Sequence, residues 1–306
     1  MLRVATFNVN GIRATQRRGF DDWLRRREVD VAALQEVRCP VPLLPSGAFA
    51  DYHLAYDAGQ LAGRNGVAVL TREQPAAIRS WGAGVLVRAP GDAHVELSEP
   101  AESGPLAREL KAFATEGRYL EVDLADQPLT VASLYLPKGG LPAELQVPGR
   151  MREAPDGGAK FERKMRFLAG FARHLTRARR TALASGREFL VMGDFNVARS
   201  RQDLKNWRTS NRSEGFLPQE REWFDSILSP RSLVDVQRAL HPDVDGPYSW
   251  WSWLGNAFTN DTGWRIDYHL ASPRLAKVAR SAVTDREPTA SERLSDHAAV
   301  VVDYDL

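Results

Sequence analysis

Several polar residues of this 306-residue sequence stand where an apolar run ends, and their types suit the hydrolysis of phosphate esters. They are carboxylates, amides, a tyrosine and a histidine, which can bind hard metal ions, orient water and donate hydrogen bonds to phosphate oxygens. Any one of them could instead be a helix cap, a turn former or a structural histidine. So many coincidences are better explained if the side chains converge; the residues are Asn8, Asn10, Glu36, Tyr135, Asp194, Asn196, Asp267, Asp296 and His297.

The types of these groups favour a hard divalent cation. Glu36, helped by Asn10 and Asp296, offers oxygen ligands. The sequence has one cysteine and six histidines, so Mg²⁺ or Mn²⁺ is favoured over Zn²⁺. Asp194 and Asn196 lie two residues apart, so an extended chain would point both side chains the same way.

The histidine suits a role at a phosphate. His297 could donate a hydrogen bond to a phosphate oxygen while Asp267, or another carboxylate, holds its imidazole in one tautomer. Such a set polarises a phosphoryl group, aligns a water and neutralises developing charge, as phosphodiester hydrolysis requires. The sequence lacks the GxxxxGK[ST] loop of NTPases, so an NTPase mechanism is not supported.

Short, β-branched apolar runs predict the strands that would position these groups. The pattern in 160–175 predicts a helix with Phe161, Met165, Leu168, Ala172 and Leu175 on its buried stripe, ended by the glycine of "ASGR". A weaker helix is expected over 20–27, and a hairpin turned at "ADQP". Mixed strands and helices without a linker predict one α/β domain over 1–306, in which strand-end loops share a ligand-binding rim. The predicted strands are 2–7, 29–34, 66–71, 119–124, 129–136, 188–192, 265–271 and 298–302.

Two further segments have alternative interpretations. "ATFNVN" (5–10) and "GDFNVA" (193–198) repeat Phe-Asn-Val after an apolar run, which indicates either two similar halves or a chance recurrence. The Gly- and Pro-rich stretch 139–160 is too long for a plain connector, so we expect a flexible insertion, either a functional flap or an idle one.

Composition limits the possible classes of protein. A net charge of +2 does not indicate wholesale coating of nucleic acid, so any polyanion contact must come from a local basic surface. A single cysteine, Cys39, suits a reducing interior. No signal peptide and no apolar run of about 20 residues is present, so we expect a cytoplasmic, monomeric protein that does not bind membranes.

Eight motifs, in order along the chain, resemble those of the exonuclease III-type apurinic/apyrimidinic endonucleases of the endonuclease/exonuclease/phosphatase superfamily. The resemblance runs from about residue 2 to 302 and implies a DNase I-like, four-layer α/β sandwich of two packed mixed β-sheets flanked by helices. The motifs are "FNVNGIRA", "LQEVR", "GVAVLT", "LYLPKG", "GDFNVA", "DLKN…GFLPQER", "YSWW…GWRIDYHLAS" and "SDHAAV".

The resemblance also implies an activity and a partner. The expected reaction is Mg²⁺-dependent cleavage of double-stranded DNA on the 5′ side of abasic sites, with 3′–5′ exonuclease action and removal of 3′ blocking groups as companions. One alternative is mainly a 3′–5′ exodeoxyribonuclease. Others are a superfamily member acting on a lipid, a phosphoinositide or an RNA tail, and a DNA-damage binding module without activity.

By resemblance, most of the polar residues named above take specific roles. Glu36 is the expected principal metal ligand, with Asn8 and Asn10 beside it, and Asp296 matches a position associated with metal binding or with positioning nearby groups. Among the expected catalytic residues, Asp194 activates or orients the attacking water and Asn196 fixes Asp194. Tyr135 contacts the scissile phosphate. His297, which Asp267 orients, binds phosphate.

The expected DNA contacts comprise an apolar pocket and a basic loop. Trp250, Trp264 and Ile266 stand where the family builds its pocket for a flipped abasic sugar, whose extrusion unpairs no base. The loop 199–215 interleaves basic residues with Asn206 and Trp207, as a phosphate-gripping loop would. Phosphate contacts are expected from Arg38, Lys138, Asn206 and Arg212.

Two features depart from the family pattern. Lys138 stands where many relatives carry glutamine or asparagine, and the stretch 139–160 exceeds the short connection usual there. Both bear on substrate preference and on the balance of exonuclease to endonuclease action, because both directly follow the tyrosine motif.

Overall fold

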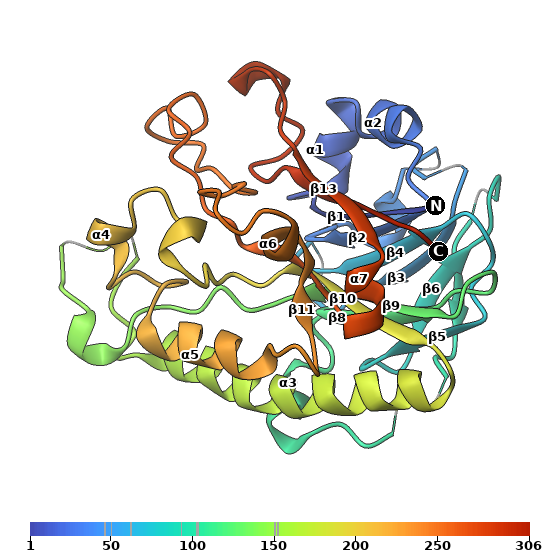
Figure 1. The fold of residues 1–306 in the computed structure, drawn as a ribbon, viewed down its shortest axis with the longest axis horizontal. Coiled ribbons are helices and arrows are strands. Elements are labelled where there is room, and N and C mark those ends of the chain that lie inside the picture. The colour runs from blue at the N-terminus through green and yellow to red at the C-terminus, as the bar shows by residue number, and fades with distance from the viewer. Residues whose placement is uncertain are drawn as a thin grey trace.

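Two mixed β-sheets packed face to face form the centre of the molecule (Figure 1). The computed structural model describes residues 1–45, 47–49, 51–61, 63–92, 94–101, 104–149, 151 and 153–306. In these ranges the first sheet has the order β13 (Ala279–Asp285), β14 (Ala299–Tyr304), β1 (Leu2–Asn8), β2 (Val31–Gln35), β4 (Val67–Thr71), β3 (His53–Asp57), β6 (Val85–Arg88) and β7 (Glu96–Ser98). The second has the order β11 (Val234–Asp235), β12 (Asp267–Ala271), β10 (Glu188–Asp194), β9 (Leu129–Tyr135), β8 (Tyr119–Asp123) and β5 (Ala77–Ser80).

Each sheet contains one parallel pair near its middle, β1 with β2 and β9 with β10, and its other pairs are antiparallel. These central strands are buried on both faces, which is why they read as continuous apolar runs. In β1, Leu2 and Val4 face the core between the sheets, whereas Ala5 and Phe7 face a second core beneath helices.

Helices cover the outer faces of both sheets (Figure 1). On the first sheet lie α1 (Ile12–Arg17) and α2 (Phe20–Arg27); on the second lie the long α3 (Ala159–Ala184) and α5 (Pro218–Ile227). The predicted four layers are therefore confirmed. Short helices α4 (Trp207–Ser210), α6 (Val236–Leu240) and α7 (Pro273–Lys277) complete the connections.

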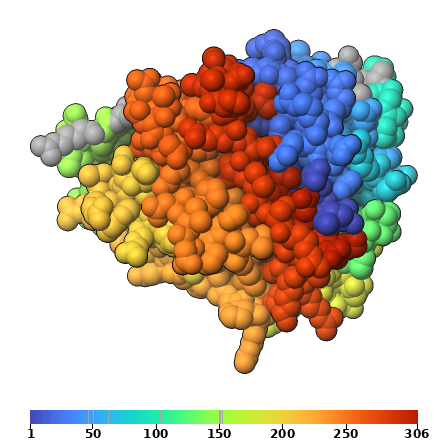
Figure 2. All heavy atoms as spheres, turned by 45° about the horizontal axis from the view of Figure 1, so that its top comes forward, coloured from blue at the N-terminus to red at the C-terminus, as the bar shows by residue number. Residues whose placement is uncertain are grey.

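The ends of the chain lie side by side. Strand β14 near the C-terminus pairs with β1, and the N-terminal amine donates to the carbonyl of Leu306. The space-filling view shows the orange and red C-terminal segments running next to the blue N-terminal surface (Figure 2). This pairing brings Asp296 and His297, just before β14, close to the residues that follow β1.

The sequence predicted the central strands correctly and missed the peripheral ones. All eight predicted strands are present within a few residues of their expected bounds, and β8 and β9 form the predicted antiparallel hairpin. The strands that were missed are β3, β5, β6, β7, β11 and β13, of which β5, β7, β11 and β13 lie at sheet edges. Most residues of β7 and β13 are exposed or half-buried, so these strands lack the continuous apolar runs on which the prediction depended.

The buried face of α3 was predicted only in part. Leu168 and Leu175 are buried as predicted, but Phe161, Met165 and Ala172 are half-buried, and the buried face also includes the polar residues Lys164 and His174. An apolar stripe could not include a lysine and a histidine, so the prediction missed part of the face. The predicted end at "ASGR" is confirmed, with Gly186 at a φ of 73°.

The stretch between β9 and α3 is organised around one glutamine. The Gln146 amide donates to Leu141 O at 2.8 Å and Asp156 Oδ1 at 2.6 Å, and its oxygen accepts from the backbone N–H groups of Asp156 and Gly157. Arg150 and Arg152 of this predicted insertion lie outside the described residues. Whether the stretch acts as a flap stays a prediction.

None of the helices in the described ranges is long and apolar enough to cross a bilayer.

The two sheets are joined through a buried histidine, His269 of β12. Its ring nitrogens lie 3.1 Å from Val300 O and 3.3 Å from Tyr304 Oη, both on β14 of the other sheet. Burial lowers the pKa of His269 to about 4 although the Val300 carbonyl acts in the opposite sense.

We predict that this histidine makes stability fall in acid. The folded pKa of about 4 lies below the unfolded value, so the unfolded state gains the proton first as pH falls. The contribution is complete above about pH 6.5 and is lost towards pH 4, by up to about 3 kcal/mol. Urea denaturation at pH 7, 5.5 and 4.5 should show a smaller loss for His269→Gln than for the wild type. The exposed control His94→Gln should behave as wild type; an equal loss in His269→Gln would contradict the assignment.

Candidate active site

The carboxyl ends of the two parallel strand pairs meet at one edge of the sandwich. In the first sheet Asn8 pairs with Gln35, and in the second Asp194 pairs with Tyr135, so all four strands end level. The Asn8 amide nitrogen lies 3.1 Å from Glu36 Oε1 and 2.9 Å from Asp194 Oδ2. Those two oxygens, from different sheets, are therefore at most about 6 Å apart.

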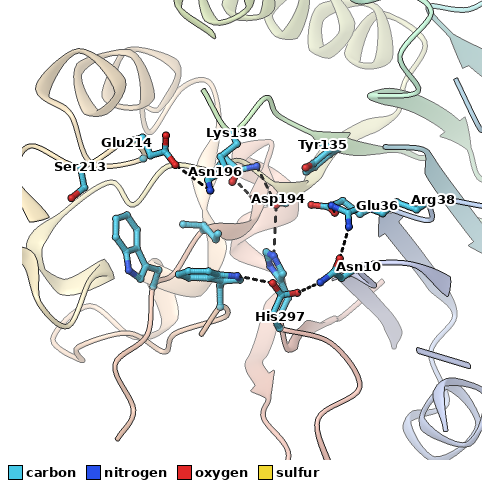
Figure 3. Close-up of a pocket in the computed structure, with 15 residues that line it drawn as sticks. Asn10, Glu36, Arg38, Tyr135, Lys138, Asp194, Asn196, Ser213, Glu214 and His297 are labelled. Carbon is cyan, nitrogen blue, oxygen red and sulfur yellow. Dashed lines mark hydrogen bonds and ion pairs between the residues drawn. The ribbon is translucent and has the colours of Figure 1, made fainter. Parts of the chain in front are cut away.

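A cleft of about 730 Å³ opens above these strand ends (Figure 3). Figure 3 shows Glu36, Arg38 and Asn10 on one side, Ser213 and Glu214 on the other, and Asp194 and His297 between them. Most of the predicted site residues line it. The lining residues are Asn10, Glu36, Arg38, Tyr135, Lys138, Asp194, Asn196, Ser213, Glu214, Gly215, Trp250, Trp264, Ile266, Asp296 and His297.

Two similar turns follow β1 and β10. The Asn8 side chain accepts from the backbone N–H of Asn10 at 3.0 Å, and the Asp194 side chain accepts from that of Asn196 at 2.8 Å. Asn10 and Asn196 have φ of 44° and 49°, a left-handed conformation that asparagine tolerates. Asp194 and Asn196 thus approach each other through a turn, not along an extended chain as the sequence predicted.

These turns revise the interpretation of the Phe-Asn-Val repeat. The equivalent positions in space are Asn8 with Asp194 and Asn10 with Asn196, so the tripeptides are offset by two residues from the structural likeness. The two halves do end a strand in the same way, but the shared tripeptide does not mark the equivalent residues.

A glycine is required immediately before Asp194. A Cβ on Gly193 would lie 2.0 Å from the Leu134 carbonyl oxygen, and its φ is 146°. Neighbouring strands β9 and β10 therefore approach closely at their ends, which brings Tyr135 and Asp194 beside each other. The "GD" of "GDFNVA" has this steric cause.

His297 lies between two buried carboxylates. Its Nδ1 is 2.8 Å from Asp267 Oδ2, and its Nε2 is 3.8 Å from Asp194 Oδ2. Burial alone would lower the pKa of His297, but Asp267, Asp194 and Asp296 together raise it to about 10. The imidazole is therefore a cation at neutral pH, with one nitrogen tied to Asp267 and the other directed towards Asp194.

Asp194 and Tyr135 are both held in unusual protonation equilibria. Burial, reinforced by Asp267 and Glu36 and opposed by His297, raises the pKa of Asp194 to about 7. Burial and then the charges of Glu36 and Asp194 raise the pKa of Tyr135 well above its usual value. Near pH 7, Asp194 can give or take a proton, while the phenol of Tyr135 stays a donor.

Oxygen ligands for a cation gather on the Glu36 side of the cleft. The Arg38 guanidinium is paired with Glu36 and donates to Asn10 Oδ1 at 2.7 Å. Asn10 in turn donates to Asp296 Oδ1 at 2.8 Å. A positive group thus already sits among carboxylate and amide oxygens, the donor set that suits hard divalent ions.

A second group could also bind a metal: Asp194, Asp267 and His297 have ligand atoms within 4.8 Å of one another. Its His297 Nδ1 and Asp267 Oδ2 are already used in their mutual hydrogen bond. Both polar atoms of the Asn8 side chain are used in hydrogen bonds: Nδ2 donates to the Glu36 and Asp194 carboxylates, and Oδ1 accepts from the Asn10 backbone N–H.

One wall of the cleft is apolar. The backbone of Trp250 forms isolated antiparallel β-bridges with Trp264 and His297. The indole rings of Trp250 and Trp264 pack edge to face, with 6.3 Å between their centroids. Ile266 lies in the same small apolar cluster. Trp250 Nε1 also donates to Asp296 Oδ2 at 3.1 Å, so this wall is joined to the polar set.

Buried charges support the apolar wall from behind. Arg265, between Trp264 and Ile266, is fully buried and binds Asp235 through two nitrogens at 2.9 and 2.7 Å and Asp203 at 2.7 Å. Removing one member of such a buried set leaves an uncompensated charge, which costs several kcal/mol. The set therefore fixes the segment before β12 that carries Trp264 and Ile266.

Not all the predicted DNA contacts lie at the cleft. Asn206 and Arg212 are exposed around α4, outside the described residues that line it. The sequence analysis missed Glu214, whose carboxylate pairs with Lys138 Nζ at 3.1 Å across the cleft mouth. The sequence could have indicated Glu214 as a site residue, since it directly precedes the "GFLPQER" motif.

Comparison with known proteins identifies the family. Residues 5–297 match the Endonuclease/Exonuclease/phosphatase family. The chain belongs to this family. It is homologous over its full length to exonuclease III and AP endonucleases and is a nuclease-type phosphodiesterase.

Individual relatives differ in what they do. An exodeoxyribonuclease of Bacillus subtilis is 26% identical over 303 residues, which is 98% of either chain. An AP endonuclease from Archaeoglobus fulgidus has the same fold, with a TM-score of 0.77, 24% identity and complete coverage of both chains. So does a 3′ phosphatase from Neisseria bound to a product DNA hairpin, with a TM-score of 0.77, 22% identity and complete coverage of both chains. At this distance the relatives do not fix which of these activities the protein has.

We predict that Asp267 controls the charge of His297. Asp267→Asn removes the nearest carboxylate charge, so the pKa of His297 should fall by about 1–3 units. The imidazole signals of metal-free protein, followed by NMR during a pH titration, measure this directly. His269, which contacts other groups, serves as the internal control and should titrate as before. A His297 pKa unchanged in Asp267→Asn would refute this electrostatic role.

Proposed function

We propose that the protein is a Mg²⁺-dependent DNA repair endonuclease that cleaves the phosphodiester on the 5′ side of abasic sites. The observation that supports this most directly is the apolar wall of Trp250, Trp264 and Ile266 inside the same cleft as Asp194 and His297. A nucleotide without a base exposes an apolar sugar face and leaves the helix at little cost. Such a wall is suited to receive that sugar beside the catalytic groups.

The roles of the polar residues follow from their protonation. Asp194, with a pKa of about 7, takes a proton from water or orients it, and Asn196 holds Asp194 by a 3.2 Å hydrogen bond. The cation of His297, oriented by Asp267, donates to a phosphate oxygen where negative charge develops. The protonated phenol of Tyr135 supplies a further donor.

The oxygen donors of the site fit Mg²⁺ or Mn²⁺. Glu36, Asp296 and Asn10 would hold the ion, and Asn8 would align the Glu36 and Asp194 carboxylates rather than supply an oxygen. When bound, the ion polarises the phosphoryl oxygens and offsets their charge. Arg38, now paired with Glu36, would then be free to bind a DNA phosphate.

Double-stranded DNA is the proposed partner. Lys138 and Arg38 at the cleft and Asn206 and Arg212 on the exposed loop can contact phosphates on either side of the scissile bond. Because both sheets contribute to one cleft, we also propose that residues 1–306 act as one domain.

The main alternative is a 3′–5′ exodeoxyribonuclease that uses the same catalytic set. The Lys138–Glu214 pair favours this possibility, because it places a carboxylate in the lining of the cleft, where a continuing phosphate backbone would be repelled. A 3′ end would meet less of this repulsion than an internal site.

An assay on two matched duplexes distinguishes the abasic-site endonuclease from the exonuclease. With Mg²⁺, the protein should nick a duplex that carries a tetrahydrofuran abasic analogue and leave a 3′-hydroxyl, and EDTA should abolish the reaction. The matching duplex without the abasic analogue is the control for undamaged ends. Absence of nicking together with rapid shortening of the control from its 3′ ends would assign the protein as an exonuclease.

We further predict that His297→Ala lowers kcat by about 10³-fold while affinity for abasic duplex changes little. The reason is that the imidazolium acts on charge that develops only in the transition state. Single-turnover nicking and fluorescence anisotropy measure the two quantities. The reverse pattern, weak binding with a nearly normal rate, would place His297 in substrate binding instead.

A further inference from the structure

Lys164 of α3 is a fully buried lysine beneath the cleft. Its ammonium group donates to Glu220 Oε1 at 2.6 Å, Asn196 O at 2.9 Å and Lys138 O at 3.0 Å. An ammonium group has three N–H donors, so all three are used. Two of the acceptors are backbone carbonyls of residues that line the cleft.

The two carbonyls belong to the segments that follow β9 and β10. Asn196 has a φ of 49° and donates its side-chain amide to Leu136 O at 2.9 Å and to Asp194. The Leu136 N–H donates to Asp194 O at 2.9 Å. Lys164 therefore holds both segments from below at the point where they bind each other.

Glu220 extends this anchor into α5. Its Oε1 accepts from Lys164 and its Oε2 accepts from the Leu217 N–H at 3.0 Å, at the start of the helix. Both members of the ion pair are fully buried. A single charged pair thus ties α3 and α5 to the two segments that carry Lys138 and Asn196.

The adjacent glycine fits this lysine. A Cβ on Gly139 would lie 2.5 Å from Lys164 Cδ, and the φ of Gly139 is 86°. The chain after Lys138 thus passes directly over the lysine stem. Gly139 and Glu220 come from two separate sequence motifs and Lys164 from the helix between them, and all three meet in this contact.

We propose that Lys164 is a positioning residue for catalysis, holding Asn196, and through it Asp194, in register with Lys138. Its role rests on the proposed function of Asp194 and Asn196. A buried ion pair contributes little net stability, since apolar replacements of similar volume are often neutral or better. Apolar replacements cannot, however, donate to the Asn196 and Lys138 carbonyls, so the lysine supplies geometry that packing alone cannot.

The test compares Lys164→Met with Arg79→Met. Arg79 of β5 pairs with Asp123 and Glu121 of β8, outside the described residues that line the cleft, so it is the matched control for loss of an ion pair. Both variants should lower Tm. Only Lys164→Met should lower kcat per folded molecule, by about 30–100-fold with KM changed less than about threefold, because small misplacements of reacting groups have effects of this size.

Restoring the ammonium distinguishes positioning from general damage. Lys164→Cys in a Cys39→Ala background, alkylated with 2-bromoethylamine while unfolded and then refolded, carries an amine of nearly the native length. Its kcat should return to within about threefold of the Cys39→Ala parent. If Lys164→Met does not fold, Gly139→Ala, whose Cβ would press on the Lys164 stem and whose backbone would be strained at a φ of 86°, should lower kcat in the same sense.

A readout without substrate keeps the two proposals separate. Hydrogen exchange should quicken at the Leu136 amide in Lys164→Met and stay unchanged in Arg79→Met. If the wild type does not nick abasic DNA, the proposed function fails, and the same variants are then compared by 3′-exonuclease rate and by exchange. A kcat within threefold of wild type in folded Lys164→Met, or no change in exchange, would overturn the positioning role.

Discussion

The site depends on bringing carboxylates of two different sheets together. One oxygen of Glu36 and one of Asp194 lie at most about 6 Å apart, where two unit charges at an effective dielectric of about 20 repel by about 3 kcal/mol or more. The Asn8 amide donates to both. Among the described residues at this end of the cleft, the four carboxylates Glu36, Asp194, Asp267 and Asp296 are opposed by Arg38 and His297, while Lys138 is paired with Glu214. The surplus of negative charge is what a divalent ion would offset. Burial, reinforced by the charges of Asp267 and Glu36, raises the pKa of Asp194 to about 7.

Backbone conformation at the site follows function more than local preference. Asn10, Glu36, Arg38 and Asn196 all have φ between 44° and 51°. For asparagine this left-handed conformation is tolerated, but for glutamate and arginine it is disfavoured by about 1 kcal/mol or more. Ladder hydrogen bonds on either side impose it, since the Gly11 N–H donates to Glu36 O and the Arg38 N–H donates to Asn65 O. The turns aim side chains back over the strand ends and into the cleft, which a continuing strand could not do.

The sequence predicted those features that neighbouring residues determine and missed those that depend on contacts distant in the sequence. The central strands and the polar residues at their ends were predicted, because burial on both faces leaves a continuous apolar run and the ends of neighbouring strands share one rim. The polar part of the buried face of α3 was not, because the charged partners of Lys164 and His174, Glu220 and Glu121, are distant in the sequence. The same limit applies to the turn at Asn196, since nothing in "GDFNVA" reveals that its φ is positive. Long-range ion pairs and single dihedral angles leave no periodic pattern.

Three parts of the cleft are each supported by a different set of buried charges. Lys164–Glu220 lies beneath the Lys138 and Asn196 side, Arg265 with Asp203 and Asp235 lies behind the tryptophan wall, and Asp267 lies behind His297. Apolar burial is non-directional and would let these walls settle at several angles. Hydrogen-bonded charges have narrow distance and angle requirements, and breaking one leaves the other exposed to a large desolvation penalty. The sandwich therefore obtains its net stability mainly from apolar cores and the shape of its cleft from ionic contacts.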